Sequence, residues 1–199
     1  MKKFIVSFFV VCLIAFWASQ AKAVSPYIGL DYVYSKYNYD MGERYSGKWF
    51  QEKYDGGAAS LGLKLNNNFA IEGFYQQTES NQSQTSGFAA TGDTLTTKMR
   101  FKAYGVDLVR DLLNARVVEV LASVGVAKYE VDVSRDYSAG GVSSLTKERL
   151  DGEALRLGIG MQLNFSQHYA FRTMFRYSLT TIDEIEDIKE ITAGIRYTF

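Results

Sequence analysis

The 199-residue sequence predicts an all-β fold: an eight-stranded antiparallel up-and-down transmembrane β-barrel with short periplasmic turns and four longer extracellular loops. Three observations lead to this prediction. Eight segments alternate apolar and polar residues with the period of a β-strand. The connections between them alternate between short and long, which is the layout of membrane barrels. After residue 23 no segment approaches the roughly 18 apolar residues of a membrane helix, so only a closed barrel would satisfy the backbone in lipid.

The first 23 residues have the pattern of a signal peptide. Lys2 and Lys3 form a positive start, Phe4–Ala18 is apolar, and Ala21-Lys22-Ala23 is a small-residue cleavage site. The apolar run is short for a transmembrane anchor, and a cleavage site follows it at once. We therefore expect a cleaved signal peptide at 1–23 and a barrel domain at 24–199.

The composition of the remaining chain excludes several classes of protein. Cys12, the one cysteine, lies in the predicted signal peptide, so disulfides and thiolate metal sites are not expected. Without Lys2, Lys3 and Lys22 the chain has 19 basic and 22 acidic residues, a formal charge of −3. This balance does not indicate nucleic-acid binding.

The first four strands are expected at about Tyr27–Tyr37, Tyr54–Leu65, Phe69–Thr78 and Thr97–Arg110. In each strand one face is mainly apolar and the other is small or polar. The segment Lys98–Lys102 departs from this rule, because its basic residues fall on the apolar face. It indicates either a β-bulge or a stretch of strand above the bilayer.

The last four strands are expected at about Val117–Val133, Gly152–Phe165, Tyr169–Ser178 and Ile191–Phe199. The alternation is cleanest from Leu155 to Phe165. The last strand places Ile195, Tyr197 and Phe199 on one apolar face that ends with the chain. Exposed aromatic residues at such a position suit a lipid surrounding and the aromatic girdle of a membrane barrel.

The connections separate the two ends of the predicted barrel. Residues 66–68, 111–116 and 166–168 are short turns, and the longer loops lie near 38–53, 79–96, 134–151 and 179–188. An even number of strands places both chain ends at the short-turn side. We expect this side to face the periplasm and the long loops to face the exterior.

The polar faces of the strands carry charges that a closed barrel would bury. The acidic residues are Asp31, Glu72, Asp107 and Glu119, and the basic ones are Lys64, Arg156, Arg172, Arg176 and Arg196. Closure would place Arg196 beside Asp31, and Glu72 could meet Arg172 or Arg176. A solid core of paired charges is one interpretation, because unpaired buried charges are costly. A narrow ion pathway lined by the same residues is the other.

Seven glycines also lie on the polar faces of the strands. They are Gly29, Gly62, Gly105, Gly125, Gly158, Gly160 and Gly194. A small barrel has a narrow interior that alternating small and large groups must fill. These glycines therefore favour an eight-stranded barrel over a wide pore.

Signals for catalysis and cofactors are weak. The one histidine, His168, falls in a predicted periplasmic turn, whereas hydrolases built on such barrels use a histidine near the outer rim. No zinc-type cluster or phosphate-binding loop is present, so we expect no enzyme, metal or cofactor. The motif Gly47-Lys48-Trp49 matches the G-x-W signature of lipocalins, which leaves a soluble lipocalin-like carrier as an alternative.

The signal peptide, the eight strands, the loop rhythm and the terminal Ile195-x-Tyr197-x-Phe199 together resemble small outer-membrane β-barrels. That family includes OmpA/OmpX-like barrels, opacity-type adhesins and surface antigens. The resemblance implies insertion in a Gram-negative outer membrane among lipid and lipopolysaccharide. It also implies that Ile195, Tyr197 and Phe199 form the signal read by the barrel-assembly machinery.

The resemblance leaves the function open, because this fold carries many activities. Our first hypothesis is a non-enzymatic surface protein with a structural or adhesive role, whose loops meet a host or surface ligand. The second is a narrow pore for ions or small solutes.

Overall fold

The computed structural model describes residues 24–39, 52–86, 93–115, 117–139 and 142–199. The predicted signal peptide and the Gly47-Lys48-Trp49 motif lie outside these residues. Within them no helix is long and apolar enough to cross a membrane. The strands are β1 (Ser25–Tyr39), β2 (Lys53–Lys64), β3 (Phe69–Thr78), β4 (Asn81–Ser86), β5 (Thr94–Ala115), β6 (Val118–Ala139), β7 (Val142–Asn164), β8 (Tyr169–Thr180) and β9 (Ile185–Thr198).

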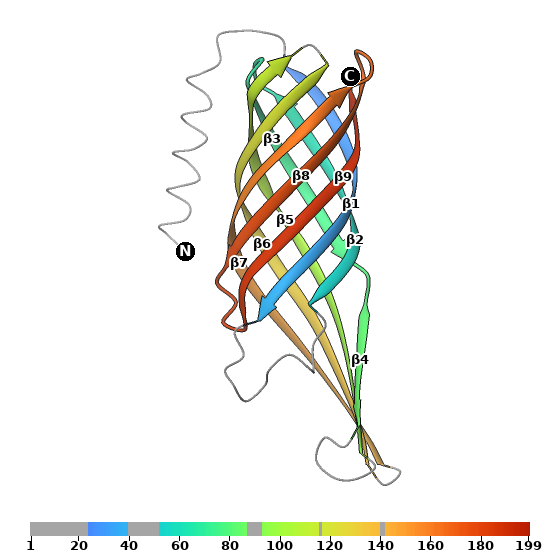
Figure 1. Cartoon of the computed structure of the whole chain (residues 1–199). Coiled ribbons are helices and arrows are strands. Elements are labelled where there is room, and N and C mark those ends of the chain that lie inside the picture. Colours follow the sequence, from blue (N-terminus) through green and yellow to red (C-terminus); the bar gives the residue numbers. More distant parts are fainter. Residues whose placement is uncertain (1–23, 40–51, 87–92, 116, 140–141) are drawn as a thin grey trace.

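The strands close into an antiparallel barrel. Their order is β3-β2-β1-β9-β8-β7-β6-β5-β4, and β3 also pairs with β5, which joins the two ends of the sheet. β4 pairs with β5 beyond the end of β3, so β3 and β4 together occupy one strand position in the barrel. The nine strands therefore form a barrel with eight strand positions (Figure 1). The predicted fold class is confirmed.

Side chains of the turns stabilise the short-turn end. The Asn66 Oδ1 atom accepts hydrogen bonds from the backbone N–H groups of Asn68 (2.8 Å) and Phe69 (2.9 Å), an Asx turn. At the same end the Phe199 N–H donates to the Pro26 carbonyl oxygen over 3.1 Å. The first and last strands therefore meet here, in the register that closes the barrel between β1 and β9.

Three strands are much longer than the sequence pattern indicates. β5 and β6 have 22 residues each and β7 has 23, whereas β3 has 10. Together with β4 they form a sheet that extends beyond the barrel (Figure 1). Much of the predicted loops 79–96 and 134–151 is therefore strand. Serine, threonine and charged residues made these segments look like loops, but antiparallel pairing satisfies their backbone.

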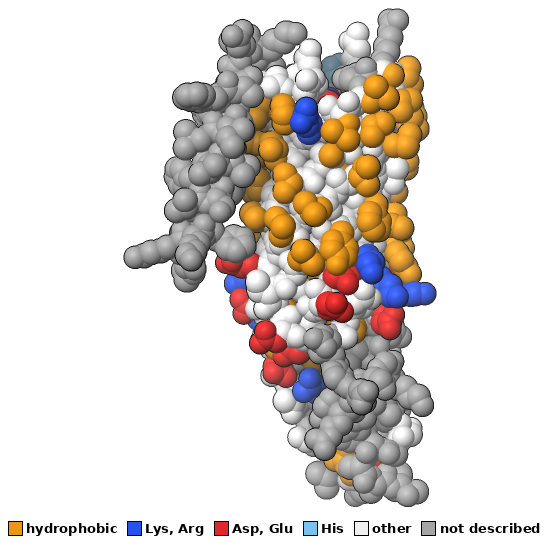
Figure 2. All heavy atoms as spheres, turned by 60° about the vertical axis from the view of Figure 1, so that its left-hand side comes forward, with side chains coloured by type: hydrophobic (Ala, Val, Ile, Leu, Met, Phe, Trp, Pro, Cys, Tyr) orange, Lys and Arg blue, Asp and Glu red, His pale blue; other side chains and the backbone are white. Residues whose placement is uncertain are grey.

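Side-chain polarity reverses along the long strands while the pairing register continues. In β6 the outward residues are apolar as far as Val126, and then Lys128 and Asp132 follow on the same face. The inward residues change in the opposite sense, and Tyr129 and Val131 are fully buried. Figure 2 shows the same boundary, with a broad hydrophobic surface next to a border of charged side chains. The outer surface therefore passes from lipid to water between Val126 and Lys128.

This reversal explains the unusual pattern at Lys98–Lys102. The β5–β6 register is continuous through the segment, and its irregularity lies between Asp111 and Leu113. Lys98 faces outward, whereas Met99 and Phe101 are buried inside. The continuous register shows that a bulge within 98–102 is wrong, and the reversal of polarity favours the other interpretation, a stretch of strand above the bilayer.

Glycines on the inward face make room for large neighbours. A Cβ atom at Gly62 would overlap the Tyr27 ring, and one at Gly29 would lie 2.6 Å from the Arg196 guanidinium carbon. The narrow interior therefore alternates glycines with aromatic and arginine side chains.

Candidate functional site

An aromatic cluster fills the interior at the end of the barrel nearest the extended sheet. The rings of Tyr37 and Phe101 stack with centroids 3.8 Å apart, and Tyr54 packs edge-on against Phe101 at 4.7 Å. All three side chains are fully buried. Apolar residues such as Val131 and Ile188 complete this cluster.

Between the aromatic cluster and the short-turn end of the barrel, two carboxylates bind arginines in the interior. Arg196 donates two hydrogen bonds to Asp31, at 2.9 and 2.7 Å, from the neighbouring strand. Arg172 donates to both oxygens of Glu72, at 2.6 and 2.7 Å, and the Tyr27 hydroxyl donates to Glu72 at 2.8 Å. Arg176 and Arg196 each lie 3.9 Å from Glu72. Such bidentate, charge-assisted contacts fix the geometry of the interior.

A second group of charges is centred on Arg156. Its guanidinium nitrogens lie 3.4 Å from Asp107 and 3.3 Å from Glu190, and the group sits over the Phe74 ring at 3.8 Å. Arg176 lies 3.7 Å from the same Asp107 oxygen. The guanidinium group of Arg156 thus links strands on three sides of the interior.

Glu190 is a member of this network that the sequence reasoning missed. It is fully buried, and Gln76 donates a hydrogen bond to it over 2.6 Å. The last strand was expected to begin at Ile191, whereas β9 begins at Ile185. Alternate residues of a strand point to the same side, so Glu190 faces the interior like Thr192 and Arg196. This alternation would have identified Glu190 from the sequence.

The network balances its own charge. Four buried arginines (Arg156, Arg172, Arg176 and Arg196) face four buried carboxylates (Asp31, Glu72, Asp107 and Glu190). Glu119 lies apart, where it accepts hydrogen bonds of 2.9 Å from both Gln162 and Asn164. Lys64 is only partly buried at the end of β2.

His168 lies far from the charged network. It is exposed in the β7–β8 turn, where its Nδ1 atom is 2.9 Å from the Thr198 carbonyl oxygen and its ring stacks on Tyr197. Among the residues that the structure describes, no group of three or more His, Cys, Asp or Glu side chains could hold a metal ion.

The extended sheet carries a charged outward face that can contact other molecules. Register places Lys98, Ser134 and Lys147 side by side on β5, β6 and β7. Arg100, Asp132 and Arg149 form the next row toward the barrel. All six side chains project from the same face, because positions on paired strands share their orientation.

The two rows differ in how their charges are compensated. Asp132 accepts from Lys102 at 3.0 Å and from Arg149 at 2.9 Å. Lys98 and Lys147 make no ion pair within the described ranges. This end of the sheet therefore presents two exposed ammonium groups with no carboxylate between them.

Comparison with known proteins identifies the family. A family model for the outer membrane protein beta-barrel domain matches residues 8–199. The chain belongs to this family. This outer-membrane protein has its short-turn end toward the periplasm and its extended sheet outside the cell. No curated protein sequence matches it.

Solved structures show the same fold at low sequence identity. Ail, the attachment invasion locus protein of Yersinia pestis, was solved in complex with the heparin analogue sucrose octasulfate. It is 16% identical with a TM-score of 0.58, over 89% of this chain and 100% of that chain. Neisserial surface protein A is 13% identical with a TM-score of 0.58 over the same shares. A major outer membrane protein from Thermus thermophilus is 10% identical with a TM-score of 0.55, again over 89% and 100%.

Proposed function

We propose that this outer-membrane barrel is a non-enzymatic surface protein whose extended sheet binds external polyanions such as sulfated glycans. The observation that carries the proposal is the row Lys98–Ser134–Lys147, whose two ammonium groups form no ion pair among the described residues. Neighbouring strands are about 4.8 Å apart, so the two lysines emerge roughly 10 Å from each other. Long, flexible lysine side chains at this spacing can reach successive sulfate groups, and Ser134 can donate a hydrogen bond between them.

The comparisons support a surface role of this kind. The structure of Ail contains a sulfated heparin analogue, and Ail shares the barrel fold of this chain. In the present protein the strands themselves bring the lysines together. The polyanion is thus expected to contact a sheet surface as well as the loops.

The contents of the barrel interior favour a scaffold role and argue against a pore. The aromatic cluster and the balanced arginine–carboxylate network occupy successive levels of the lumen, and their side chains are buried. We therefore propose that the barrel anchors and stiffens the extended sheet. Reproducible single-channel steps in planar bilayers would favour the narrow-pore alternative.

We also propose that the barrel-assembly machinery reads Ile195, Tyr197 and Phe199. Ile195 and Phe199 are exposed on the lipid face of the barrel. The ring of Tyr197 contacts those of Tyr169 and Phe199, each with centroids 5.1 Å apart. The final strand thus presents alternating apolar side chains beside an aromatic cluster at the periplasmic rim.

The polyanion proposal can be tested with sucrose octasulfate as the probe. The purified barrel in lipid nanodiscs is titrated by calorimetry, and Lys98→Gln/Lys147→Gln is compared with Lys128→Gln. Lys128 is a suitable control because Asp151 already pairs with it at 2.9 Å. We expect the double variant to lose affinity about tenfold or more, and the wild-type affinity to fall as salt screens the charges. Equal affinities of wild type and double variant would contradict the proposal.

A further inference from the structure

The sheet that extends beyond the barrel has two edges. Its strand order is β7-β6-β5-β4, so β7 and β4 are the outer strands. β8 pairs with β7 only from Ala154 onward, and the segment Ser143–Gly152 pairs on the β6 side alone. Within the described ranges, Gln82–Ser86 of β4 pairs only with β5. Each edge therefore carries backbone N–H and C=O groups with which a further strand can pair.

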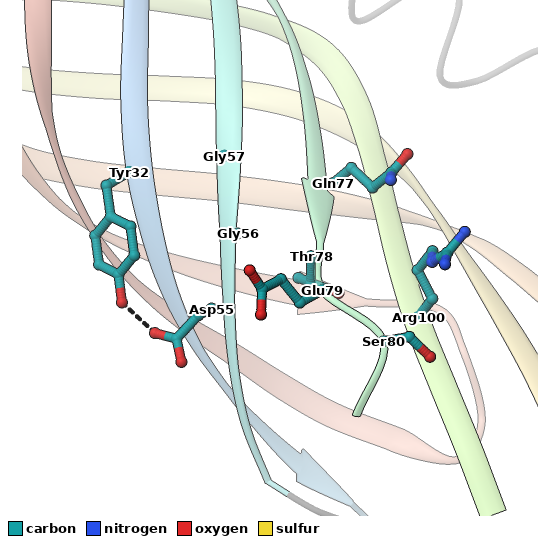
Figure 3. Close-up of a pocket in the computed structure, with 9 residues that line it drawn as sticks. All are labelled: Tyr32, Asp55, Gly56, Gly57, Gln77, Thr78, Glu79, Ser80 and Arg100. Carbon is teal, nitrogen blue, oxygen red and sulfur yellow. Dashed lines mark hydrogen bonds between the residues drawn. The ribbon is translucent and has the colours of Figure 1, made fainter. Parts of the chain in front are cut away.

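The β4 edge begins where the chain leaves β2. Figure 3 shows the chain beyond the end of β3 at Glu79, with Asp55 of β2 on one side and Arg100 of β5 on the other. The Glu79 N–H donates to the Asp55 carbonyl oxygen over 2.7 Å, and the Asn81 side chain donates to the Lys53 carbonyl oxygen over 2.8 Å. These contacts hold the start of β4 beside β2. Farther along, no described strand pairs with this side of β4.

Hydrogen bonds nearby fix which residues direct their backbone groups to the free edges. On β7, the Glu153 carbonyl oxygen accepts from the Thr181 N–H over 2.8 Å, on the β8 side. On β5, the Phe101 N–H donates to Thr78 Oγ1 over 3.0 Å, on the side where β4 lies. Alternate residues direct their backbone groups to the same side of a strand. The free-edge groups therefore belong to Asp151, Arg149 and Lys147 of β7 and to Gln82, Gln84 and Ser86 of β4.

The stagger of the strands sets the height of each edge above the membrane. A row of paired residues that starts at Phe69 runs around the barrel and returns to the same strand position at Glu79, ten residues nearer the outside. A level line therefore falls behind this row by roughly one residue per strand. The row from Gln82 on β4 ends at Lys147 on β7. In an adjacent copy at the same depth, four strand steps move the residue opposite Gln82 about five positions from Lys147 toward the barrel, close to Asp151.

We propose that adjacent copies of this protein in the outer membrane join their extended sheets, with β4 of one copy paired to the free edge of β7 of the next. β4 and β7 are antiparallel within the sheet, so two copies with the same orientation in the membrane present them antiparallel. One register satisfies the height, the side-chain faces and the backbone directions together. It places Gln82 opposite Asp151, Gln84 opposite Arg149 and Ser86 opposite Lys147, with about six backbone hydrogen bonds.

The side chains of the two edges favour this pairing over pairing of like edges. β4 has the sequence NQSQTS and carries no charge, whereas the β7 edge carries Lys147, Arg149 and Asp151. Two β7 edges would bring charged side chains together, while amide and hydroxyl groups of β4 can donate to or accept from each of them. The contact uses different edges of the two copies. Each copy therefore keeps one edge available, and the pairing continues into a row or closes into a ring.

Disulfide trapping in intact cells tests the proposal, because Cys12, the one cysteine, lies in the predicted signal peptide. Gln82→Cys/Asp151→Cys places two thiols opposite each other between copies, whereas within one copy these positions are three strands and at least about 14 Å apart, too far for a disulfide. We expect oxidation to give a ladder of dimers and larger oligomers. Each single-cysteine variant and Gln82→Cys/Asp136→Cys, whose second thiol is exposed on the central strand β6, should stay monomeric.

Gln84→Pro in the double-cysteine protein tests the backbone hydrogen bonds between copies. The Gln84 N–H points to the free edge, so proline removes a donor to the next copy and leaves the pairing of β4 with β5 in place. We expect Gln84→Pro to abolish the ladder and Gln84→Ala to retain it, with heat-modified mobility in SDS gels as the check of folding. Four results would each overturn the proposal: only monomers from the double variant, a ladder from a single-cysteine variant or the β6 control, a crosslink to a different protein, or a ladder that Gln84→Pro leaves unchanged.

Discussion

Replacing Glu72 by Gln tests whether the interior network stabilises the barrel as a unit. Glu72 is fully buried, receives two hydrogen bonds from Arg172, and lies 3.9 Å from both Arg176 and Arg196. Glutamine keeps the shape and one acceptor oxygen, so Tyr27 retains a partner. The substitution therefore removes a charge from a neutral cluster and leaves its arginines with an excess of one positive charge.

The magnitude follows from the burial of these charges. Opposite unit charges about 4 Å apart attract by roughly 4 kcal/mol at an effective dielectric constant of about 20. Breaking one partner out of a buried ion pair costs about 3–5 kcal/mol, because the remaining charge stays desolvated. We expect Glu72→Gln to lower the free energy of unfolding by about 3–5 kcal/mol. Arg172→Met in the same chain removes the excess charge, so the double variant should cost less than the sum of the single ones.

Urea titration of the barrel folded into lipid vesicles, followed by tryptophan fluorescence and SDS-gel mobility, measures these values. Glu148→Gln is the control, because Glu148 pairs with Arg135 at 3.4 Å on the exposed sheet. That pair should contribute less than about 1 kcal/mol. Similar costs for Glu72→Gln and Glu148→Gln, or full additivity with Arg172→Met, would refute the reasoning.

Three further predictions concern the membrane face, the chain end and the extended sheet. Leu157→Arg should lower the free energy of unfolding by roughly 2–4 kcal/mol in the same assay, and Leu145→Arg on the water-exposed sheet should leave it almost unchanged. Equal effects of the two substitutions would place Leu157 outside the bilayer. Deletion of Phe199 should lower the amount of barrel in outer-membrane fractions and leave export intact, so normal outer-membrane levels would count against the assembly signal. The pKa of Asp132 is lowered by Lys102, its first hydrogen-bond donor, and by Arg149. The stabilisation from this pairing is fully present at pH values above the ordinary aspartate pKa, and it is lost as the pH falls through the lowered pKa of Asp132. An NMR titration should show a higher pKa for Asp132 in Lys102→Gln. An unchanged pKa would contradict this prediction.

The strands inside the membrane could be predicted from the sequence because two environments act on alternate residues. Lipid selects apolar side chains on one face, and the narrow interior selects small or charged ones on the other. The predicted strand Phe69–Thr78 accordingly has the same bounds as β3. The parts of β6 after Val133 and of β7 before Gly152 could not be found in this way, because most of their side chains are exposed to water and the alternation of apolar and polar residues weakens.

The details of the interior required the closed structure. Arg196 and Asp31 lie on the last and first strands, which closure must pair, so their proximity is a matter of topology. Arg156 contacts both Asp107 and Glu190, which stand on strands separated from β7 within the sheet. Such contacts across the lumen depend on barrel diameter and strand stagger, which hydrophobic alternation does not encode.

The reversal of polarity along β5 and β6 bears on where this protein can recognise its partners. On the short-turn side of this boundary the outward residues are apolar because they face lipid. The charged residues inside form ion pairs with one another in a balanced network. On the extended-sheet side of the boundary, apolar residues such as Phe101 and Val131 pack in the interior, and charged residues lie on the outer surface. Recognition of polar ligands should therefore be sought on that outer surface, where Lys98 and Lys147 stand without carboxylate partners among the described residues.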